Sequence, residues 1–76
     1  MQAIVDGVRC DTKTAAIIHE WPNVTLYRAA GKRFLFMHYH GWDPERIEAV
    51  AHEDAVELLQ TKGDPMAVDL LYESAD

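Results

Sequence analysis

The sequence predicts a small α+β protein, with an antiparallel sheet of four to five strands followed by two short helices packed on one face. Two observations lead to this fold class. Residues 1–40 alternate strand-like segments with turn residues, and the C-terminal half carries helix start and stop signals in two places. With 76 residues, of which 49% are hydrophobic, the chain is expected to form a single domain over residues 1–76 with a thin core.

Four segments of the first half have the composition of strands. In chain order they are AIVDGVR, AAIIHEW, VTLYRAA and KRFLFMHYH. The polar link CDTKT follows the first, and WPN ends the second because Pro22 removes a backbone donor and Asn23 favours turns. Between the last two, Gly31 can adopt a positive φ, so that Ala30-Gly31 predicts a tight hairpin. We therefore expect an antiparallel meander of four strands over residues 1–40.

The segment FLFMHY is apolar on both faces of its predicted strand. Phe34 and Phe36 share one face. Leu35, Met37 and Tyr39 share the other. Such a strand is central in its sheet, or it has a helix on one face and a partner subunit on the other. A homodimer that hides the second face is therefore one expected assembly, and it would suit an accessory or regulatory protein.

The segment that follows the sheet allows two interpretations. Asp43 as N-cap, Pro44 at the first helical position and Gly63 after the last turn are consistent with one helix over residues 44–61. In the second interpretation, RIEAV is a short edge strand and the helix covers only residues 52–61. Local periodicity alone leaves both open.

The tripeptide GDP predicts a second helix near the end of the chain. Gly63 ends one helix, Asp64 caps the next, and Pro65 takes its first position. The expected core stripe of this last helix consists of Met66, Leu70 and Leu71. Together these signals place both helices after the sheet.

Composition indicates a cytoplasmic protein. Cys10 is the one cysteine, so no intrachain disulfide can form, and a reducing compartment is expected. The start of the chain lacks the basic region and apolar run of a signal peptide. No apolar run approaches the ~20 residues that a membrane helix needs, so no membrane partner is expected.

Charge is distributed unevenly along the chain. Residues 1–42 carry three acidic and five basic residues, whereas residues 43–76 carry ten acidic and two basic ones, within a net charge of −6. An acidic half repels phosphate and disfavours direct binding to nucleic acid. It favours a protein or ribonucleoprotein partner with a basic surface, including one that normally holds nucleic acid. The alternative is an acidic surface that serves solubility alone.

Several short motifs are spread over most of the chain. They are DTKTA (Asp11 to Ala15), TLYR (Thr25 to Arg28), GKRFLF after the glycine turn, IEAVAHEDAVELL (Ile47 to Leu59) and the final GDPMAVDLL. This pattern resembles a group of short proteins of bacteriophages and mobile elements. In that group the isoleucine-led stretch is a strand, so the resemblance favours the strand-plus-helix interpretation. The context includes anti-CRISPR proteins, which implies an inhibitor of a host defence complex that acts by steric occlusion or acidic mimicry of nucleic acid.

The pair His38 and His40 is the main candidate for enzymatic chemistry. The two residues share a strand face, so both could reach one metal ion, as in a metal-dependent hydrolase. A structural zinc site needs four ligands and a catalytic one usually three plus water. Asp43, His19 and His52 stand at no diagnostic spacing. We therefore expect no bound metal, no other cofactor and no enzymatic activity.

The residues expected to bind a partner are acidic or aromatic. They are Glu53, Asp54, Glu57, Asp64, Asp69, Glu73, Tyr39 and Trp42. The acids are expected on exposed helix faces, and aromatic residues are enriched at interface hot spots. Trp21 and Trp42 are alternatively lids over a small core. The basic turn with Arg28, Lys32 and Arg33 is expected to be exposed and to keep the hairpin soluble.

Overall fold

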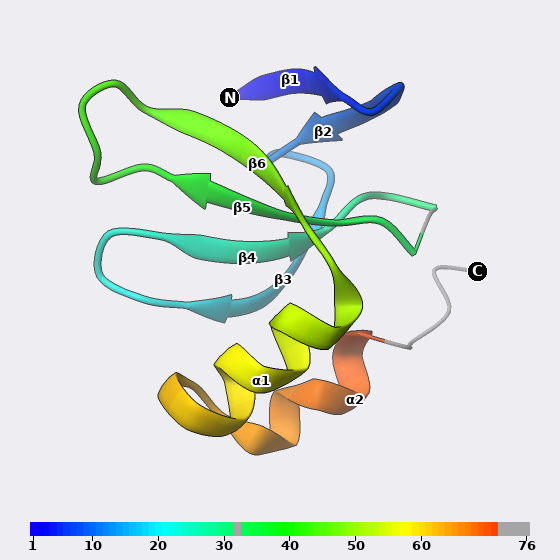
Figure 1. Ribbon diagram of the computed structural model, residues 1–76. Helices are drawn as coiled ribbons and strands as arrows, with labels where there is room; N and C mark the ends of the chain where they lie inside the picture. Colours follow the sequence, from blue (N-terminus) through cyan, green and yellow to red (C-terminus); the bar gives the residue numbers. More distant parts are fainter. Residues whose placement is uncertain (32, 72–76) are drawn as a thin grey trace.

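The computed structural model describes residues 1–31 and 33–71 and confirms the α+β fold (Figure 1). The strands are β1 (Gln2–Val5), β2 (Val8–Asp11), β3 (Ala16–Glu20), β4 (Thr25–Arg28), β5 (Leu35–Tyr39) and β6 (Arg46–Val50). The helices are α1 (His52–Lys62), the 3-10 turn η1 (Pro65–Ala67) and α2 (Val68–Leu71). Within the described ranges, no helix is long and apolar enough to cross a membrane.

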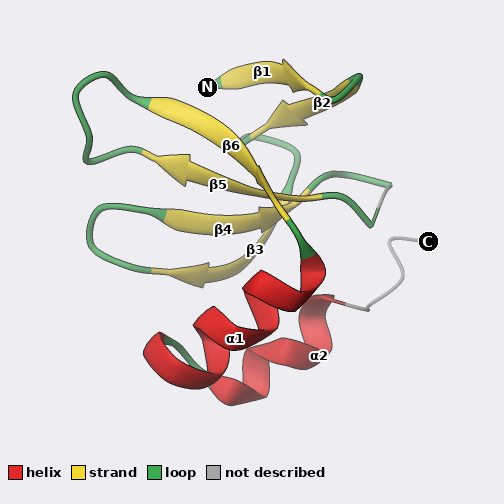
Figure 2. Cartoon of the chain, in the orientation of Figure 1, coloured by secondary structure: helices red, strands yellow, loops and turns green. Residues whose placement is uncertain are grey.

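The strands are arranged as a hairpin and a larger sheet. Strand β1 pairs with β2, while β3, β4, β5 and β6 pair in chain order, each antiparallel to the next. The hairpin lies on one side of the larger sheet, and the two helices lie on the other (Figure 2). The molecule therefore has three layers, with β4 and β5 at the centre of the middle layer.

The expectation that AIVDGVR is one strand is wrong, because this segment folds into the β1–β2 hairpin. Its turn consists of Asp6 (φ 50°) and Gly7 (φ 76°), between the paired residues Val5 and Val8. A two-residue turn of type I′ needs positive φ at both central positions, and Asp-Gly is one of its preferred pairs. The chain therefore reverses two residues after β1 ends, and the predicted meander begins only at β3.

Strand β6 decides between the two interpretations of the second half. The segment RIEAV pairs with β5 from Arg46 opposite Tyr39 to Val50 opposite Leu35. The interpretation of residues 44–61 as one helix is therefore wrong, and the strand followed by a helix from His52 is confirmed. The deciding interaction is the long-range ladder with β5.

The end of the described chain begins its last helical segment as the sequence predicts but buries only one of the three expected core residues. Asp64 caps η1, because its side chain accepts a hydrogen bond from the backbone N–H of Met66 at 2.9 Å. The expected core stripe is wrong for Met66, which is 78% exposed, and Leu70 is also exposed. Leu71, the third residue of the expected stripe, is buried as predicted, and Ala67 is buried beside it. The first turn is a 3-10 turn with three residues per turn, so the α-helical spacing does not apply to it.

Two apolar clusters hold the layers together. On the helix side, the buried residues are Ile18, Leu26, Leu35, Met37, Ala55, Leu59, Ala67 and Leu71. On the hairpin side, they are Cys10, Tyr27, Ala29 and Phe36. Leu35 and Phe36 are neighbours in β5, and each is almost completely buried in a different cluster. The second apolar face of β5 is thus covered within one chain by the β1–β2 hairpin.

The turn between β4 and β5 is confirmed as a hairpin, but one of its basic residues points inward. The Ala29 N–H donates to the Phe34 carbonyl at 2.9 Å, and Gly31 has φ 70°. Arg28 is only 7% exposed, and its Nη1 donates to the Leu70 carbonyl at 3.3 Å on the helix side. The expectation that Arg28 lies on an exposed turn is therefore wrong. Arg33 is exposed, and Lys32 lies outside the described residues.

Candidate binding site

The histidine pair lies on the hairpin side of the larger sheet and is occupied by protein contacts. His38 is buried, and its Nε2 lies 3.4 Å from Glu45 Oε1 without a hydrogen bond inside the described chain. His40 Nε2 lies 3.1 Å from Thr25 Oγ1. Among residues 1–31 and 33–71, no group of three or more His, Cys, Asp or Glu is placed to hold a metal ion. The metal-site alternative therefore has no structural support in this part of the chain.

Burial is the main cause of the raised pKa values of Cys10 and Tyr27 in the hairpin-side cluster. Burial raises the pKa of the Cys10 thiol, and the Asp6 carboxylate adds to the increase. Burial likewise raises the pKa of Tyr27, with a contribution from Glu20. Because the thiolate is the nucleophilic form, a buried and protonated Cys10 is an inert core residue.

The acids Glu53, Asp54 and Glu57 lie together on the exposed face of α1. Glu53 and Glu57 are one turn apart, and Asp54 is three residues before Glu57. The opposite face buries Ala55 and Leu59 in the helix-side cluster. None of the three carboxylates forms an ion pair or hydrogen bond with another described residue. We refer to these three residues as the acidic face.

The second expected acidic cluster is only partly brought together. Asp64 and Asp69 are exposed. Asp64 uses one carboxylate oxygen to cap η1, and Asp69 lies in the first turn of α2. Glu73 lies outside the described residues. Local capping therefore accounts for Asp64 without a partner.

The structure brings Tyr39 and Trp42 into direct contact and adds Arg46, a residue that the sequence did not single out. Their ring centroids are 5.2 Å apart in an edge-to-face arrangement. The guanidinium carbon of Arg46 lies 4.8 Å from the Tyr39 centroid and 5.0 Å from that of Trp42. Arg46 Nε also donates to Glu48 at 2.8 Å. Tyr39, Trp42 and Arg46 form what we call the aromatic–arginine cluster, and Trp42 is 50% exposed.

The antiparallel register explains this cluster. Arg46 is the first residue of β6 and lies directly opposite Tyr39, the last residue of β5. The loop between them carries Trp42 back over both side chains. Arg46 can be identified as a member of the cluster only from the pairing of β5 with β6, which the sequence alone does not determine.

Two loops lie side by side at the end of the sheet that carries this cluster (Figure 1). The Gly41 N–H, in the β5–β6 loop, donates to the Asn23 carbonyl in the β3–β4 loop at 3.0 Å. A Cβ atom at Gly41 would lie 2.9 Å from the Asn23 Cα, which is closer than real contacts allow. Glycine is therefore needed for the two loops to approach.

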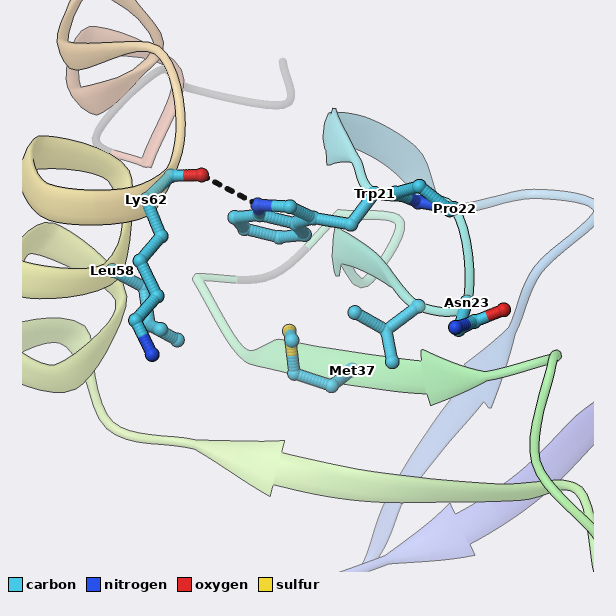
Figure 3. A pocket seen from close by; sticks show the side chains of 7 residues that line it. Trp21, Pro22, Asn23, Met37, Leu58 and Lys62 are labelled. Carbon is cyan, nitrogen blue, oxygen red and sulfur yellow. Dashed lines mark hydrogen bonds between the residues drawn. The ribbon is translucent and has the colours of Figure 1, made fainter.

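A shallow cavity of about 290 Å³ opens at the same end, between the β3–β4 loop and the end of α1 (Figure 3). It is lined by Trp21, Pro22, Asn23, Val24, Met37, Leu58 and Lys62. The Trp21 indole N–H donates to the Lys62 carbonyl at 2.7 Å. This cavity, here called the Trp21 niche, was missed from the sequence because its walls come from distant segments. Trp21 itself is the half-buried lid that the sequence predicts.

No known protein family, curated protein or solved structure matches this chain. The motif resemblance to phage and mobile-element proteins therefore stands without a matched relative. Three surface features remain as the basis for function: the acidic face, the aromatic–arginine cluster and the Trp21 niche.

Proposed function

We propose that this protein is a small, non-enzymatic binding protein that occupies a basic surface of a partner. The observation that carries the proposal is the acidic face, where Glu53, Asp54 and Glu57 are exposed and have no described cationic partner. Carboxylates without an internal partner are free to accept hydrogen bonds from lysine and arginine side chains. A contact of this kind forms quickly and weakens as salt is added.

The partner we propose is a host protein or ribonucleoprotein complex that uses its basic surface to hold nucleic acid. The distribution of charge supports this class, since ten of the thirteen acidic residues fall within residues 43–76. Direct binding of nucleic acid by such a surface would be opposed by phosphate repulsion. The motif resemblance supports a defence complex, of the kind that anti-CRISPR proteins inhibit, in the host cytoplasm.

The aromatic–arginine cluster supplies an apolar anchor for the same partner. Trp42 is half exposed, although it belongs to a residue type that contributes strongly to interfaces when buried. Arg46 and Tyr39 both contact its ring. Binding would cover the exposed part of the ring and exclude water from it.

The proposal is tested by capture from a lysate of bacterial host cells, followed by quantitative identification of the captured proteins. The wild-type protein is expected to retain a nucleic-acid-binding protein or complex, and the yield should fall as salt is added. The triple variant Glu53→Lys, Asp54→Lys, Glu57→Lys should lose it. Equal capture by the triple variant contradicts the proposal.

A matched pair of single variants separates the acidic face from net charge. Glu57→Lys and Glu20→Lys each reverse one exposed carboxylate, the first on α1 and the second at the end of β3. We expect only Glu57→Lys to weaken binding, by about two- to fivefold, which is typical of one exposed charge pair. Equal weakening by both variants would show that overall charge, and not the acidic face, controls association.

A further inference from the structure

The walls of the Trp21 niche are mostly apolar and come from three parts of the fold. In Figure 3, Trp21 lies above Met37 of β5, with Leu58 and Lys62 of α1 on the helix side. Trp21 and Leu58 pack against the helix-side cluster without being fully buried. The volume of about 290 Å³ is close to the lower end of ligand pockets, at about 300 Å³. The niche can therefore accept one small ring or branched chain.

The frame of the niche is held by hydrogen bonds that do not depend on a ligand. The Trp21 indole is fixed to the Lys62 carbonyl, and the Trp21 backbone N–H donates to the Val24 carbonyl at 2.8 Å. The His19 ring packs against the indole with centroids 4.5 Å apart. The Asn23 backbone is held by Gly41 of the neighbouring loop. A cavity that is already formed costs a ligand little reorganisation.

Gly63 keeps the indole in place against the end of α1. A Cβ atom at this position would lie 3.1 Å from Cζ2 of Trp21 and 3.3 Å from Leu59. The absence of a side chain therefore lets the ring lie close to the helix end. This close contact fixes the position of the Trp21 ring, which forms one wall of the niche.

The polar groups at the niche favour a negative charge. Lys62 extends beside Leu58 (Figure 3), and its ammonium group forms no ion pair with any described residue. Asn23 contributes an amide that can donate hydrogen bonds. The lining residues include no Asp or Glu. Lys62 and Asn23 lie at opposite ends of the niche (Figure 3), so an anion on the helix side would meet the Lys62 ammonium group.

We infer that the Trp21 niche binds a small carboxylate that carries an aromatic or branched aliphatic group. The apolar group lies between the Trp21 indole and Met37, and the carboxylate meets Lys62. This site is separate from the acidic face and has the opposite charge preference. It therefore stands or fails independently of the proposed partner.

Fluorescence of Trp21 gives a direct test. The chain has two tryptophans, so Trp42→Phe leaves Trp21 as the only tryptophan emitter. Titration with 3-phenylpropionate should change the emission in a saturable way, with a Kd on the order of a millimolar for a ligand of this size. The isosteric 3-phenylpropanamide should bind at least threefold more weakly, and 3-phenylpropylamine should not bind measurably. Absence of saturation with the carboxylate, or equal affinity for carboxylate and amide, overturns the inference.

Two lysine variants provide the matched control. Lys62→Gln should weaken binding of 3-phenylpropionate about two- to fivefold, whereas Lys13→Gln, which removes an exposed lysine between β2 and β3, should leave it unchanged. Equal effects of both variants overturn the assignment of Lys62. In the wild-type protein, NMR should show a larger ligand-induced shift for the Trp21 indole N–H than for that of Trp42. The reverse order places the ligand elsewhere and also overturns the inference.

Discussion

The two faces of the larger sheet are closed in different ways. On the helix side, aliphatic residues of the sheet, such as Leu35 of β5, pack against Leu59 of α1. On the hairpin side, the rings of Tyr27 and Phe36 stack with centroids 5.1 Å apart and an interplanar angle of 11°, and Cys10 of β2 packs in the same cluster. The apolar helix-side cluster contains no titratable residue, whereas the hairpin-side cluster contains Cys10 and Tyr27.

This difference shows how a short chain can bury a strand on both sides. A domain of this size has little apolar surface for one deep core. Here β5 contributes alternate residues to two thin cores. One is covered by the helices, and the other is covered by the hairpin of β1 and β2, two strands of four residues each. The two-sided apolar pattern of FLFMHY therefore has an explanation within a single chain.

Adjacent substitutions in β5 compare the two faces directly. Phe36→Ala should lower the free energy of unfolding by about 3–5 kcal/mol and Leu35→Ala by about 2–5 kcal/mol, because both side chains are almost fully buried. Urea unfolding at two protein concentrations measures the loss. The cost of each variant should not depend on concentration, since hairpin and helices belong to the same chain. A cost below about 1 kcal/mol for Phe36→Ala would show that the hairpin does not close a real core.

Alkaline pH should affect the hairpin side selectively. Burial raises the pKa of Cys10 and of Tyr27, so the folded state holds these protons more tightly than the unfolded state. Their contribution to stability is complete below the ordinary thiol pKa of about 8.5 and is lost as the pH rises through the folded values.

The Cys10→Ala variant isolates the thiol in this pH dependence. Between pH 8 and 10, its unfolding free energy should fall less steeply than that of the wild type. Met37→Leu, on the helix side, should keep the wild-type slope because it removes no titratable group. Identical slopes for wild type and Cys10→Ala would contradict a buried thiol.

The two tryptophans should differ by a smaller amount. Trp21→Phe removes the hydrogen bond to the Lys62 carbonyl and should cost about 1 kcal/mol. Trp42→Phe keeps an aromatic ring beside Arg46 at a half-exposed position and should cost about 0.5 kcal/mol or less. Thermal unfolding of both variants checks the order. A larger loss for Trp42→Phe would indicate that the aromatic–arginine cluster, and not the Trp21 contact, secures the loop end.

The parts of the fold that local rules determine could be predicted from the sequence. The hairpin at Gly31 and the Asp64 cap each depend on a few neighbouring residues. The Asp6-Gly7 turn is equally local, but its β-branched flanks allowed the segment to be interpreted as one strand. RIEAV could not be assigned locally, because Ile47 and Val50 suit one face of a helix as well as opposite faces of a strand. The ladder with β5 decides it.

The candidate site likewise has parts that local sequence rules predict and parts that depend on long-range contacts. The acidic face follows from helical spacing within α1, so the sequence predicts that Glu53, Asp54 and Glu57 are exposed together. Arg46 joins Tyr39 and Trp42 only through strand pairing. The Trp21 niche is formed by tertiary contacts between a loop, a strand and a helix. The periodic pattern of a single segment cannot predict such contacts.

Competition on the captured partner tests the central claim most directly. The partner is loaded with fluorescently labelled nucleic acid, and anisotropy is followed as this protein is added. If the acidic face occupies the nucleic-acid-binding surface, the label is displaced completely, at lower concentration in low salt, and Glu57→Lys displaces it less well than Glu20→Lys. If this protein binds while the nucleic acid remains in place, the acidic face does not occupy that surface, and the account is contradicted.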